Sequence, residues 1–401
     1  MEVKEGYKKT AVGVIPSDWE VKLVGESFLI CNNLRLPISE EIRKSMQGSY
    51  PYYGPTKIQD YINEYRVEGE YSLIGEDGDH FLKWKTMPMT LLVNGRFNVN
   101  NHAHLIKGRK NETITKWFYN YFKNRDISQF LTRQGAGRYK LSKSTLITIP
   151  CAIPPLPEQK AIAEVLSDAD NLIQALEKRI AKKRLIKQGA MQKLLTPKED
   201  WEVKKLGEVV DRFANGGTPS TQNSDFWEGN IPWITGADIL NQKVGEIRRY
   251  ITKEAVKNSS TNVIKKGNLL VVTRTGVGKL AIAPFDISIS QDFTGIYAKK
   301  DELLTNYLFL FFDFNKAGLQ SQNQGTSIKG ITRETLSETQ IPLPPLPQQK
   351  AIAEVLSDMD KEIEALEKKL EKYKLIKQGL MQNLLTGKIR LKYGDRHGET
   401  A

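Results

Sequence analysis

The chain has 401 residues, of which 39% are hydrophobic and 26% charged, and its net charge is +12 with a pI near 9.3. This length suits two domains, and no apolar run approaches the ~20 residues that cross a bilayer. The only cysteines, Cys31 and Cys151, do not indicate a disulfide framework or a cysteine-rich zinc site, and the first residues resemble neither a secretory nor a transit signal. We therefore expect a cytoplasmic protein.

The positive charge favours a polyanionic partner over a membrane, because no basic amphipathic anchor accompanies it. Nucleic acid is the leading candidate. On charge alone, an ordinary basic protein without such a partner fits equally well.

Residues 1–153 are predicted to form a first globular domain, in which short β-rich runs such as TLLVNG at 90–95 are interrupted by Gly, Pro and Asn. His102 and His104 alternate on one strand without a third ligand nearby in the sequence, so no metal site is expected. Asp77 and Asp79 lie in glycine-rich sequence, where carboxylates serve the turn itself.

Residues 154–197 are predicted to form a long helix, and the same segment recurs in 344–401, which comprises a second long helix and a tail. Between 154–196 and 344–386 there are 31 identities in 43 positions without a gap. The PPLP sequence before each copy suits a helix lead-in, with helix beginning near Glu158 and Gln348. A Pro-x-x-P peptide ligand is the less favoured interpretation.

A heptad pattern predicts that the two helices form an antiparallel coiled coil. It lapses at Lys187 and Lys377, and Pro197 and Gly387 follow as stop signals. The predicted seam consists of Ile162, Leu166, Ala169, Ile173, Leu176, Ile180, Ile352, Leu356, Met359, Ile363, Leu366 and Leu370.

Residues 198–343 are predicted to form a second globular domain with β-rich runs such as NLLVVTRTG at 268–276. Weaker similarity links SDWEVKLVGE at 17–26 with EDWEVKKLGE at 199–208, RQGAGRYKLSKSTL at 133–146 with NQGTSIKGITRETL at 323–336, and IGEDGDHFL at 74–82 with VTRTGVGKL at 272–280. The predicted fold class is thus α+β, with two globular domains, two long helices and a pseudo-two-fold internal repeat.

No motif for catalysis is found. RTGVGKL at 274–280 lacks the glycine spacing and the hydroxyl residue of a phosphate loop. The Asn/Asp-Pro-Pro-aromatic tetrapeptide of amino-methyltransferases is absent from the sequence, as is a glycine-rich loop for a methyl-donor cofactor. The sequence predicts a binding protein.

At this point the sequence resembles the specificity subunits of type I restriction-modification enzymes. The resemblance lies in the repeated PPLPxQKAIAEVLSDxD, in KQGLMQNLLTGKIRL at 377–391 and in GGTPSTQNSDFWEGNIPWITGADI at 216–239. SYPYYGPTKIQDYI at 49–62 and GEYSLIGEDG at 69–78 also look like parts of a target recognition domain of that family.

The resemblance implies two target recognition domains, each contacting half of a bipartite DNA sequence, on a subunit that does no chemistry itself. It further implies two methyltransferase subunits that use S-adenosylmethionine to methylate adenine N6, and motor-nuclease subunits that use ATP and Mg for cleavage. Because 27–132 and 209–322 differ, the half-sites should differ as well.

Polar and basic residues near the domain ends are the candidate DNA contacts, because base edges require Arg, Asn or Gln and phosphates require Lys, Arg or hydroxyls. Each has an alternative as an ordinary solvated side chain. They are Tyr53, Lys57, Arg96, Asn98, Arg133, Gln134, Arg138 and Lys140 in the first domain, and Thr218, Thr221, Arg274, Lys279, Gln324, Thr326, Lys329 and Arg333 in the second. A basic run on the first helix is expected to be solvated or to face a partner: Lys178, Arg179, Lys182, Lys183, Arg184 and Lys187.

Two other functions remain open. One is a recognition subunit of a different restriction or methylation architecture. The other is a coiled-coil scaffold without a DNA role.

Overall fold

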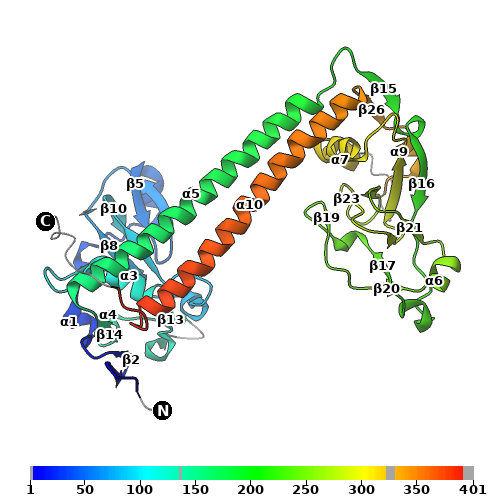
Figure 1. The fold of residues 1–401 in the computed structure, drawn as a ribbon. Coiled ribbons are helices and arrows are strands. Elements are labelled where there is room, and N and C mark those ends of the chain that lie inside the picture. The colour runs from blue at the N-terminus through cyan, green and yellow to red at the C-terminus, as the bar shows by residue number, and fades with distance from the viewer. Residues whose placement is uncertain (1–2, 135–137, 322–329, 392–401) are drawn as a thin grey trace, which may run out of the picture. The chain divides into compact units, whose positions relative to one another are not determined.

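The computed structural model describes residues 3–134, 138–321 and 330–391, and no helix within them is long and apolar enough to cross a membrane. The chain divides into two compact units, each considered by itself. Unit 1 comprises Met1–Glu177 and Lys369–Ala401, and unit 2 comprises Lys178–Lys368. Each unit therefore contains part of both long helices, α5 (Leu156–Leu195) and α10 (Leu346–Leu384) (Figure 1).

Unit 1 contains two four-stranded sheets. One has the order β4 (Phe28–Ile30), β11 (Ala103–Gly108), β8 (Tyr71–Gly75), β9 (Thr90–Val93); the other has the order β6 (Ile58–Ile62), β5 (Gln47–Tyr53), β10 (Arg96–Val99), β7 (Val67–Glu68). Three further pairs are β1 (Tyr7–Thr10) with β2 (Gly13–Pro16), β3 (Glu20–Leu23) with β14 (Pro150–Ile153), and β12 (Thr132–Gln134) with β13 (Arg138–Lys140). The helices besides α5 and α10 are α1 (Val24–Ser27), α2 (Glu40–Ser45), α3 (Thr115–Lys123) and α4 (Lys143–Ile147).

Unit 2 has the same plan. Its sheets have the orders β16 (Val210–Asn215), β25 (Phe293–Ala298), β22 (Leu269–Val272), β23 (Leu280–Ile282) and β20 (Tyr250–Ile251), β17 (Ile231–Ile234), β24 (Ile287–Ile289), β21 (Asn262–Ile264). Two pairs are β15 (Glu202–Lys205) with β26 (Gln340–Leu343) and β18 (Ile239–Leu240) with β19 (Lys243–Val244). Its other helices are α6 (Lys253–Lys257), α7 (Thr305–Phe314), α8 (Lys316–Ser321) and α9 (Arg333–Ser337).

The internal repeat thus extends to sheet topology. In each second sheet the two central strands are parallel, β5 with β10 in unit 1 and β17 with β24 in unit 2. The predicted α+β class and internal repeat are confirmed, and the repeat includes the middles of the two halves, where the sequences differ most.

One alignment made from the sequence is wrong by a residue. It matches Glu76 with Arg274, but Glu76 and Thr273 occupy equivalent places in the backbone hydrogen bonding. Leu141 N donates to Glu76 O over 2.7 Å, and Ile331 N donates to Thr273 O over 2.7 Å. Asp77 therefore corresponds to Arg274. The short motifs share glycines and hydrophobic residues in either register, which is why the sequence did not fix it.

A buried glutamine attaches each long helix to its globular part. Gln159 accepts a hydrogen bond from Ile114 N (3.1 Å) and donates to the carbonyl oxygens of Glu112 and Pro154 (3.0 and 2.9 Å). Gln349 repeats this pattern with Leu304 N, Glu302 O and Pro344 O, each at 2.9 Å. Both side chains are fully buried, so these bonds meet the requirement that buried amides be paired.

The first turns of each long helix belong to a globular core. In unit 1, Ile162 and Leu166 pack with Trp19, Trp117 and Leu384. In unit 2, Ile352 and Leu356 pack in the same way with Leu195, Trp201 and Tyr307. Helix α5 begins two residues before the expected Glu158, because the proline in its first turn needs no amide donor there.

Further along, the helices pack on each other. Among the remaining seam positions, Leu176, Ile180, Ile363 and Leu370 are buried, and Ala169, Ile173, Met359 and Leu366 are half-buried. The helices are antiparallel within each unit, since partner numbers fall on one helix as they rise on the other: Asp170 with Lys377 and Glu177 with Lys374 in unit 1, Arg184 with Glu367 and Lys187 with Asp360 in unit 2.

The two lysines at which the heptad lapses occupy largely buried positions. The side chain of Lys187 is 17% exposed and 2.6 Å from Asp360, and that of Lys377 is 12% exposed and paired with Asp170. Burial lowers the pKa of Lys377, although its bond to Asp170 opposes this. The lapse in the apolar pattern is thus a repeated ion pair.

Candidate nucleic-acid interface

Unit 2 has a polar concavity of about 770 Å³ at one edge of its sheets. Five segments meet there: the end of β16, the start of β21 with the residues just before it, the loop after β22, the loop between β24 and β25, and the start of α9. The backbone approaches closely, since a Cβ on Gly216 would lie 1.9 Å from Ser290 O. The polar side chains lining the concavity include Asn215, Ser260, Asn262, Arg274, Gln291 and Arg333.

The two arginines predicted as DNA contacts, Arg274 and Arg333, both line this concavity and are exposed. The guanidinium of Arg333 lies 5.7 Å from the ring centroid of Phe213, which limits where it can point. Thr218 does not line the concavity, but it donates to Oε1 of Gln291, which does, so its hydroxyl positions that amide.

The other predicted DNA contacts of unit 2 either do not line this concavity or lie outside the described residues. Lys279 is half-buried and its ammonium donates to Gly236 O over 2.9 Å, which gives it a structural role in the fold. Thr221 is exposed on a turn but does not line the concavity. Gln324, Thr326 and Lys329 lie outside the described residues.

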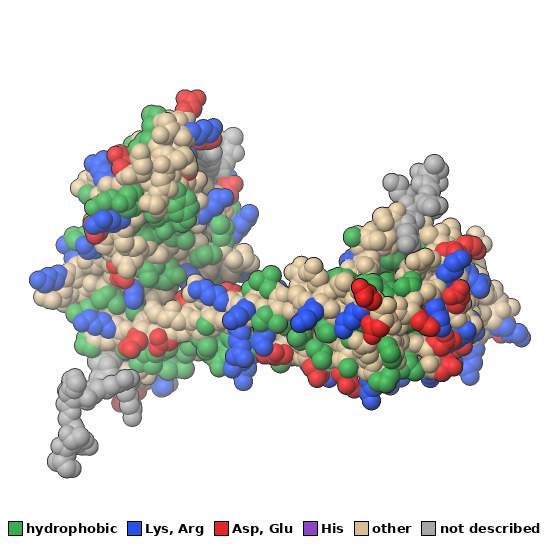
Figure 2. All heavy atoms as spheres, turned by 90° about the horizontal axis from the view of Figure 1, so that it is seen from above, with side chains coloured by type: hydrophobic (Ala, Val, Ile, Leu, Met, Phe, Trp, Pro, Cys, Tyr) green, Lys and Arg blue, Asp and Glu red, His purple; other side chains and the backbone are tan. Residues whose placement is uncertain are grey.

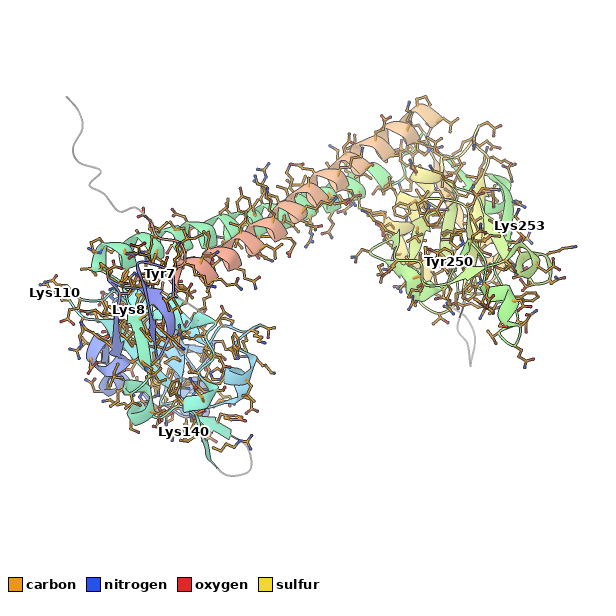
Figure 3. All side chains as sticks on the ribbon, turned by 60° about the horizontal axis from the view of Figure 1, so that its bottom comes forward. Tyr7, Lys8, Lys110, Lys140, Tyr250 and Lys253 are labelled. Carbon is orange, nitrogen blue, oxygen red and sulfur yellow. The ribbon has the colours of Figure 1, made fainter. Side chains whose placement is uncertain are left out.

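In unit 1 the hairpin of β12 and β13 lies at the corresponding edge. Arg133 is exposed, donates to Tyr139 OH over 2.7 Å and lies over its ring. Lys140, labelled in Figure 3, has its ammonium 3.8 Å from Glu76 Oε1. Gln134 and Arg138 belong to these strands by their backbone, but their side chains are outside the description.

Tyr53 and Lys57 flank the turn between β5 and β6. Lys57 is exposed, whereas Tyr53 is half-buried with its ring edge against Phe97, and burial raises its pKa. The turn is near the Glu76 loop, because a Cβ on Gly75 would meet Pro55 at 3.3 Å.

One predicted contact of unit 1, Asn98, must be corrected, and another, Arg96, stays a prediction at a different end of its strand. Asn98 is fully buried and donates to Glu64 O over 2.6 Å, so it supports the fold and is not free to contact a base. Arg96 is exposed over the ring of Tyr65, but it lies at the opposite end of β10 from the residue paired with Tyr53. Strand alternation and direction decide both cases, and neither can be read from residue type.

The two units present different chemistry on the same framework. The residue after the equivalent pair Glu76 and Thr273 is Asp77 in unit 1 and Arg274 in unit 2. Asp77 is held by His102 at 2.7 Å, and Glu76 by Arg35 at 2.6 Å. Carboxylates therefore line this edge of unit 1, where unit 2 has the buried Thr273 followed by the exposed guanidinium of Arg274.

The sequence did not single out Arg35, Asn215, Asn262 or Gln291, and it assigned Asp77 to a turn. Asn215, Asn262, Gln291 and Asp77 lie at or near strand ends, a weak signal that many polar residues share, and Arg35 follows the short 3-10 helix Asn32–Leu34. His104 is buried between Asn32 and Leu141 O, and burial lowers its pKa, so it is a structural histidine. No group of three metal-ligating side chains occurs in residues 3–134, 138–321 and 330–391.

Acidic and basic side chains are intermixed on the face drawn in Figure 2. The net positive charge is therefore spread over this surface and does not form a single basic patch there. Such a distribution attracts a polyanion in general but leaves specific contacts to particular edges.

Comparisons with known proteins agree on one family. The model of the type I restriction modification DNA specificity domain matches residues 16–184 and 198–374. Two relatives from Methanocaldococcus jannaschii are named as specificity subunits of type I restriction enzymes. The MjaX protein is 29% identical over 97% of this chain and 98% of its own length, and the MjaVIII protein is 27% identical over 97% of each chain. The crystal structure of an S subunit from M. genitalium matches with a TM-score of 0.64 at 13% identity, covering 96% of this chain and 98% of the other.

Proposed function

The chain belongs to the type I restriction-modification DNA specificity family, and on that premise we propose that it selects a bipartite DNA target by contacting one half-site with each unit. The observation that carries this proposal is that the two units share one backbone framework but present different side chains at the same edge of it. The same two backbone hydrogen bonds hold Glu76 and Thr273, yet the next residue is Asp77 in one unit and Arg274 in the other. Two such edges suit two different half-sites.

In unit 2 we assign base contacts to Arg274 and Arg333, and to the amides of Gln291 and Asn262 beside them. Arginine recognises guanine by two parallel hydrogen bonds, and glutamine or asparagine recognises adenine. Thr218 would act by orienting Gln291.

In unit 1, Arg133, Lys57 and Lys140 are proposed contacts, with Arg133 and Lys57 the most accessible. A carboxylate such as Asp77 accepts a hydrogen bond from the amino group of cytosine. The first half-site should therefore differ in base composition from the second.

We propose that this chain supplies no catalytic group, binds no cofactor of its own and acts in the cytoplasm. Methyl transfer from S-adenosylmethionine would belong to methyltransferase subunits, and ATP and Mg to motor-nuclease subunits. In the part of the chain that the structure describes, the candidate interface consists of hydrogen-bonding and charged groups at strand ends, without a clustered metal site.

Two copies of the methyltransferase subunit are proposed because each unit repeats one exposed surface. It combines the first turns of one long helix with the last turns of the other: 160–168 and 375–382 in unit 1, 350–358 and 185–192 in unit 2. Leu375 and Leu185 are each 68% exposed there. A groove beside the first turns has about 340 Å³ in unit 1 and 420 Å³ in unit 2, and the helix contributes the same residue types to both.

Reconstitution tests the proposal. The purified chain should methylate no DNA by itself, and adding its methyltransferase subunit should produce adenine methylation at one bipartite sequence, mapped by sequencing. Methylation by the chain alone would contradict the division of labour. Failure to bind any DNA, alone or in the complex, would favour a scaffold.

A second experiment tests the assignment of half-sites. Exchanging residues 27–132 for those of a relative should change one half of the methylated sequence and leave the other intact. A change in both halves would mean that the units form one composite recognition surface.

A further inference from the structure

Six ion pairs join α5 and α10. Two lie in unit 1, Asp170 with Lys377 and Glu177 with Lys374 at 3.5 Å. Four lie in unit 2: Arg184 with Glu367, Lys187 with Asp360 at 2.6 Å, Lys183 with Glu362 at 2.7 Å and Arg179 with Glu362 at 3.8 Å.

Four of these pairs are related by the internal repeat. Shifting each residue number by 190, upward from α5 and downward from α10, converts the Asp170 and Lys377 positions into those of Asp360 and Lys187, since each helix carries both members. The Glu177 and Lys374 pair is related in the same way to Glu367 and Arg184. Pairing α5 with a second α5, or α10 with a second α10, would preserve all of these contacts. They cannot decide which helices pair.

The pairs made by Glu362 are different. The residue of α5 that corresponds to Glu362 is Leu172, and the residue of α10 that corresponds to Lys183 is Tyr373. Unit 2 therefore places a lysine with a glutamate at this level, whereas unit 1 has a leucine and a tyrosine at the equivalent level. At each of these two levels, α5 contributes one residue of the pair and α10 contributes the other.

These substitutions make the long helices complementary to each other and not to themselves. In an α5 pair, Lys183 and Arg179 would face Leu172 and lose their carboxylate. In an α10 pair, Glu362 would face Tyr373 and keep only Lys369. The neighbouring charge adds to this effect, because α5 carries Lys178, Arg179, Lys182, Lys183 and Arg184 in succession, with Glu177 as the only nearby acid.

We propose that Glu362, with Lys183 and Arg179, determines helix partner choice: it directs α5 to α10 and excludes pairing of α5 with the α5 of a second copy. The remaining identity of the helices makes such a device necessary, because 159–168 is the same as 349–358, and 185–189 the same as 375–379. Because α5 and α10 belong to the same chain, their high effective concentration then favours pairing within one copy over pairing of α5 with the α10 of another copy.

The proposal also accounts for the basic run on α5. Arg179, Lys183, Arg184 and Lys187 all pair with α10, whereas Lys178 and Lys182 are exposed and make no ion pair among the described residues. Most of the run therefore faces a partner helix within the same chain.

The test uses the full chain and its mass in solution. The double substitution Glu362→Leu and Tyr373→Lys gives α10 the residues of α5 at both positions and removes the preference. Its ratio of dimer to monomer should be roughly 5- to 30-fold higher than that of the unmodified chain. The reason is that the unmodified chain gives up two exposed ion pairs on forming each dimer, whereas the variant has none of these pairs to lose. Light scattering after size-exclusion chromatography over a range of concentrations measures that ratio.

The decisive control moves the glutamate of the pair to α5 and the lysine to α10. Adding Leu172→Glu and Lys183→Tyr to the double substitution restores complementarity in the opposite sense, and the ratio should return to that of the unmodified chain. Lys361→Asn with Glu371→Ala also copies α5 residues into α10, but at positions without a partner on α5, and should change nothing.

A reporter identifies the dimer. In an antiparallel α5 pair, Asp170 would meet Lys187 of the other copy, whereas in the α5–α10 pair both residues meet α10. Asp170→Cys with Lys187→Cys, treated with a short bifunctional thiol reagent, should therefore give an interchain cross-link in the double variant and not in the four-residue exchange. The proposal is overturned if the four-residue exchange dimerises as much as the double variant, or if the double variant has the dimer fraction of the unmodified chain.

Discussion

Replacing Arg390 by alanine should destabilise unit 1 through a carboxylate that is far away in the sequence. Glu158 in the first turn of α5 is fully buried, and Arg390 contacts both of its oxygens, at 2.6 and 2.7 Å. Trp19 Nε1 donates a third bond over 2.9 Å. Arg390 also reaches Asp18, at 2.9 and 2.8 Å, and nearby Tyr7, labelled in Figure 3, donates to Gly387 O.

The expected cost follows from the burial of Glu158. Removing one partner of a buried ion pair costs about 3–5 kcal/mol. The side chain of Arg390 is 34% exposed, and Trp19 would remain bonded to the carboxylate, so about 2–3 kcal/mol is expected here. For a unit of this size, that loss lowers the melting temperature of unit 1 by roughly 5–10 °C.

The chain itself suggests the control, because the residue of α10 that corresponds to Glu158 is Gln348. In a Glu158→Gln background, Arg390→Ala should cost less than half as much, since no buried charge is left unpaired. Calorimetry on the four chains of this double-mutant cycle gives the coupling. Additive losses would refute the buried carboxylate as the cause.

The remaining predictions concern the polar groups of both units. Arg274→Ala or Arg333→Ala should weaken DNA binding by about 1–3 kcal/mol and relax one position of one half-site, whereas uniform weakening across sequences would indicate phosphate contacts. Gln159→Ala and Gln349→Ala should each lower the stability of their own unit only, by about 2–3 kcal/mol, because each leaves buried backbone groups unpaired; hydrogen exchange resolved by segment checks this. Asp170→Ala should destabilise unit 1 by about 1–2 kcal/mol by leaving largely buried Lys377 without its nearest carboxylate, whereas Lys377→Met should be nearly neutral. The hydrogen bond from Arg390 lowers the pKa of Asp18. The stability that the ionised carboxylate contributes is therefore present above the pKa of Asp18 in the unfolded chain and is lost as pH falls through its pKa in the folded chain. The melting temperature of unit 1 should fall more steeply below about pH 4 in the unmodified chain than in Arg390→Ala.

The long helices could be predicted from the sequence because their signals are periodic and duplicated. The seam residues recur at heptad spacing in both copies, and both are buried or half-buried throughout. Even the lapse at Lys187 and Lys377 is regular, since it repeats together with Asp170 and Asp360. The sequence did not show that Ile162, Leu166, Ile352 and Leu356 belong to globular cores, because an apolar residue fits a helix seam and a domain core equally well.

The candidate interface was only partly predictable. Arg274 and Arg333 are 59 residues apart in the sequence and meet because two strands and a helix start share one edge of the fold. Asn98 has a residue type suited to base contacts, but strand alternation directs its side chain into the interior. Which polar residues face outward depends on register, and the short, irregular strands here do not encode register clearly.

The shared framework explains how the edges can diverge while the fold persists. Glu76 and Thr273 are held through backbone groups, and the residue that follows, Asp77 or Arg274, is only partly enclosed. A side-chain change there alters what the edge offers to DNA at little cost to folding. Gln159 and Gln349, in contrast, satisfy buried backbone groups, so a change there would leave those groups unpaired whatever the target. The difference in burial therefore places variation at strand-end loops and constancy at the helix attachments, which is the pattern that the two halves of the chain show.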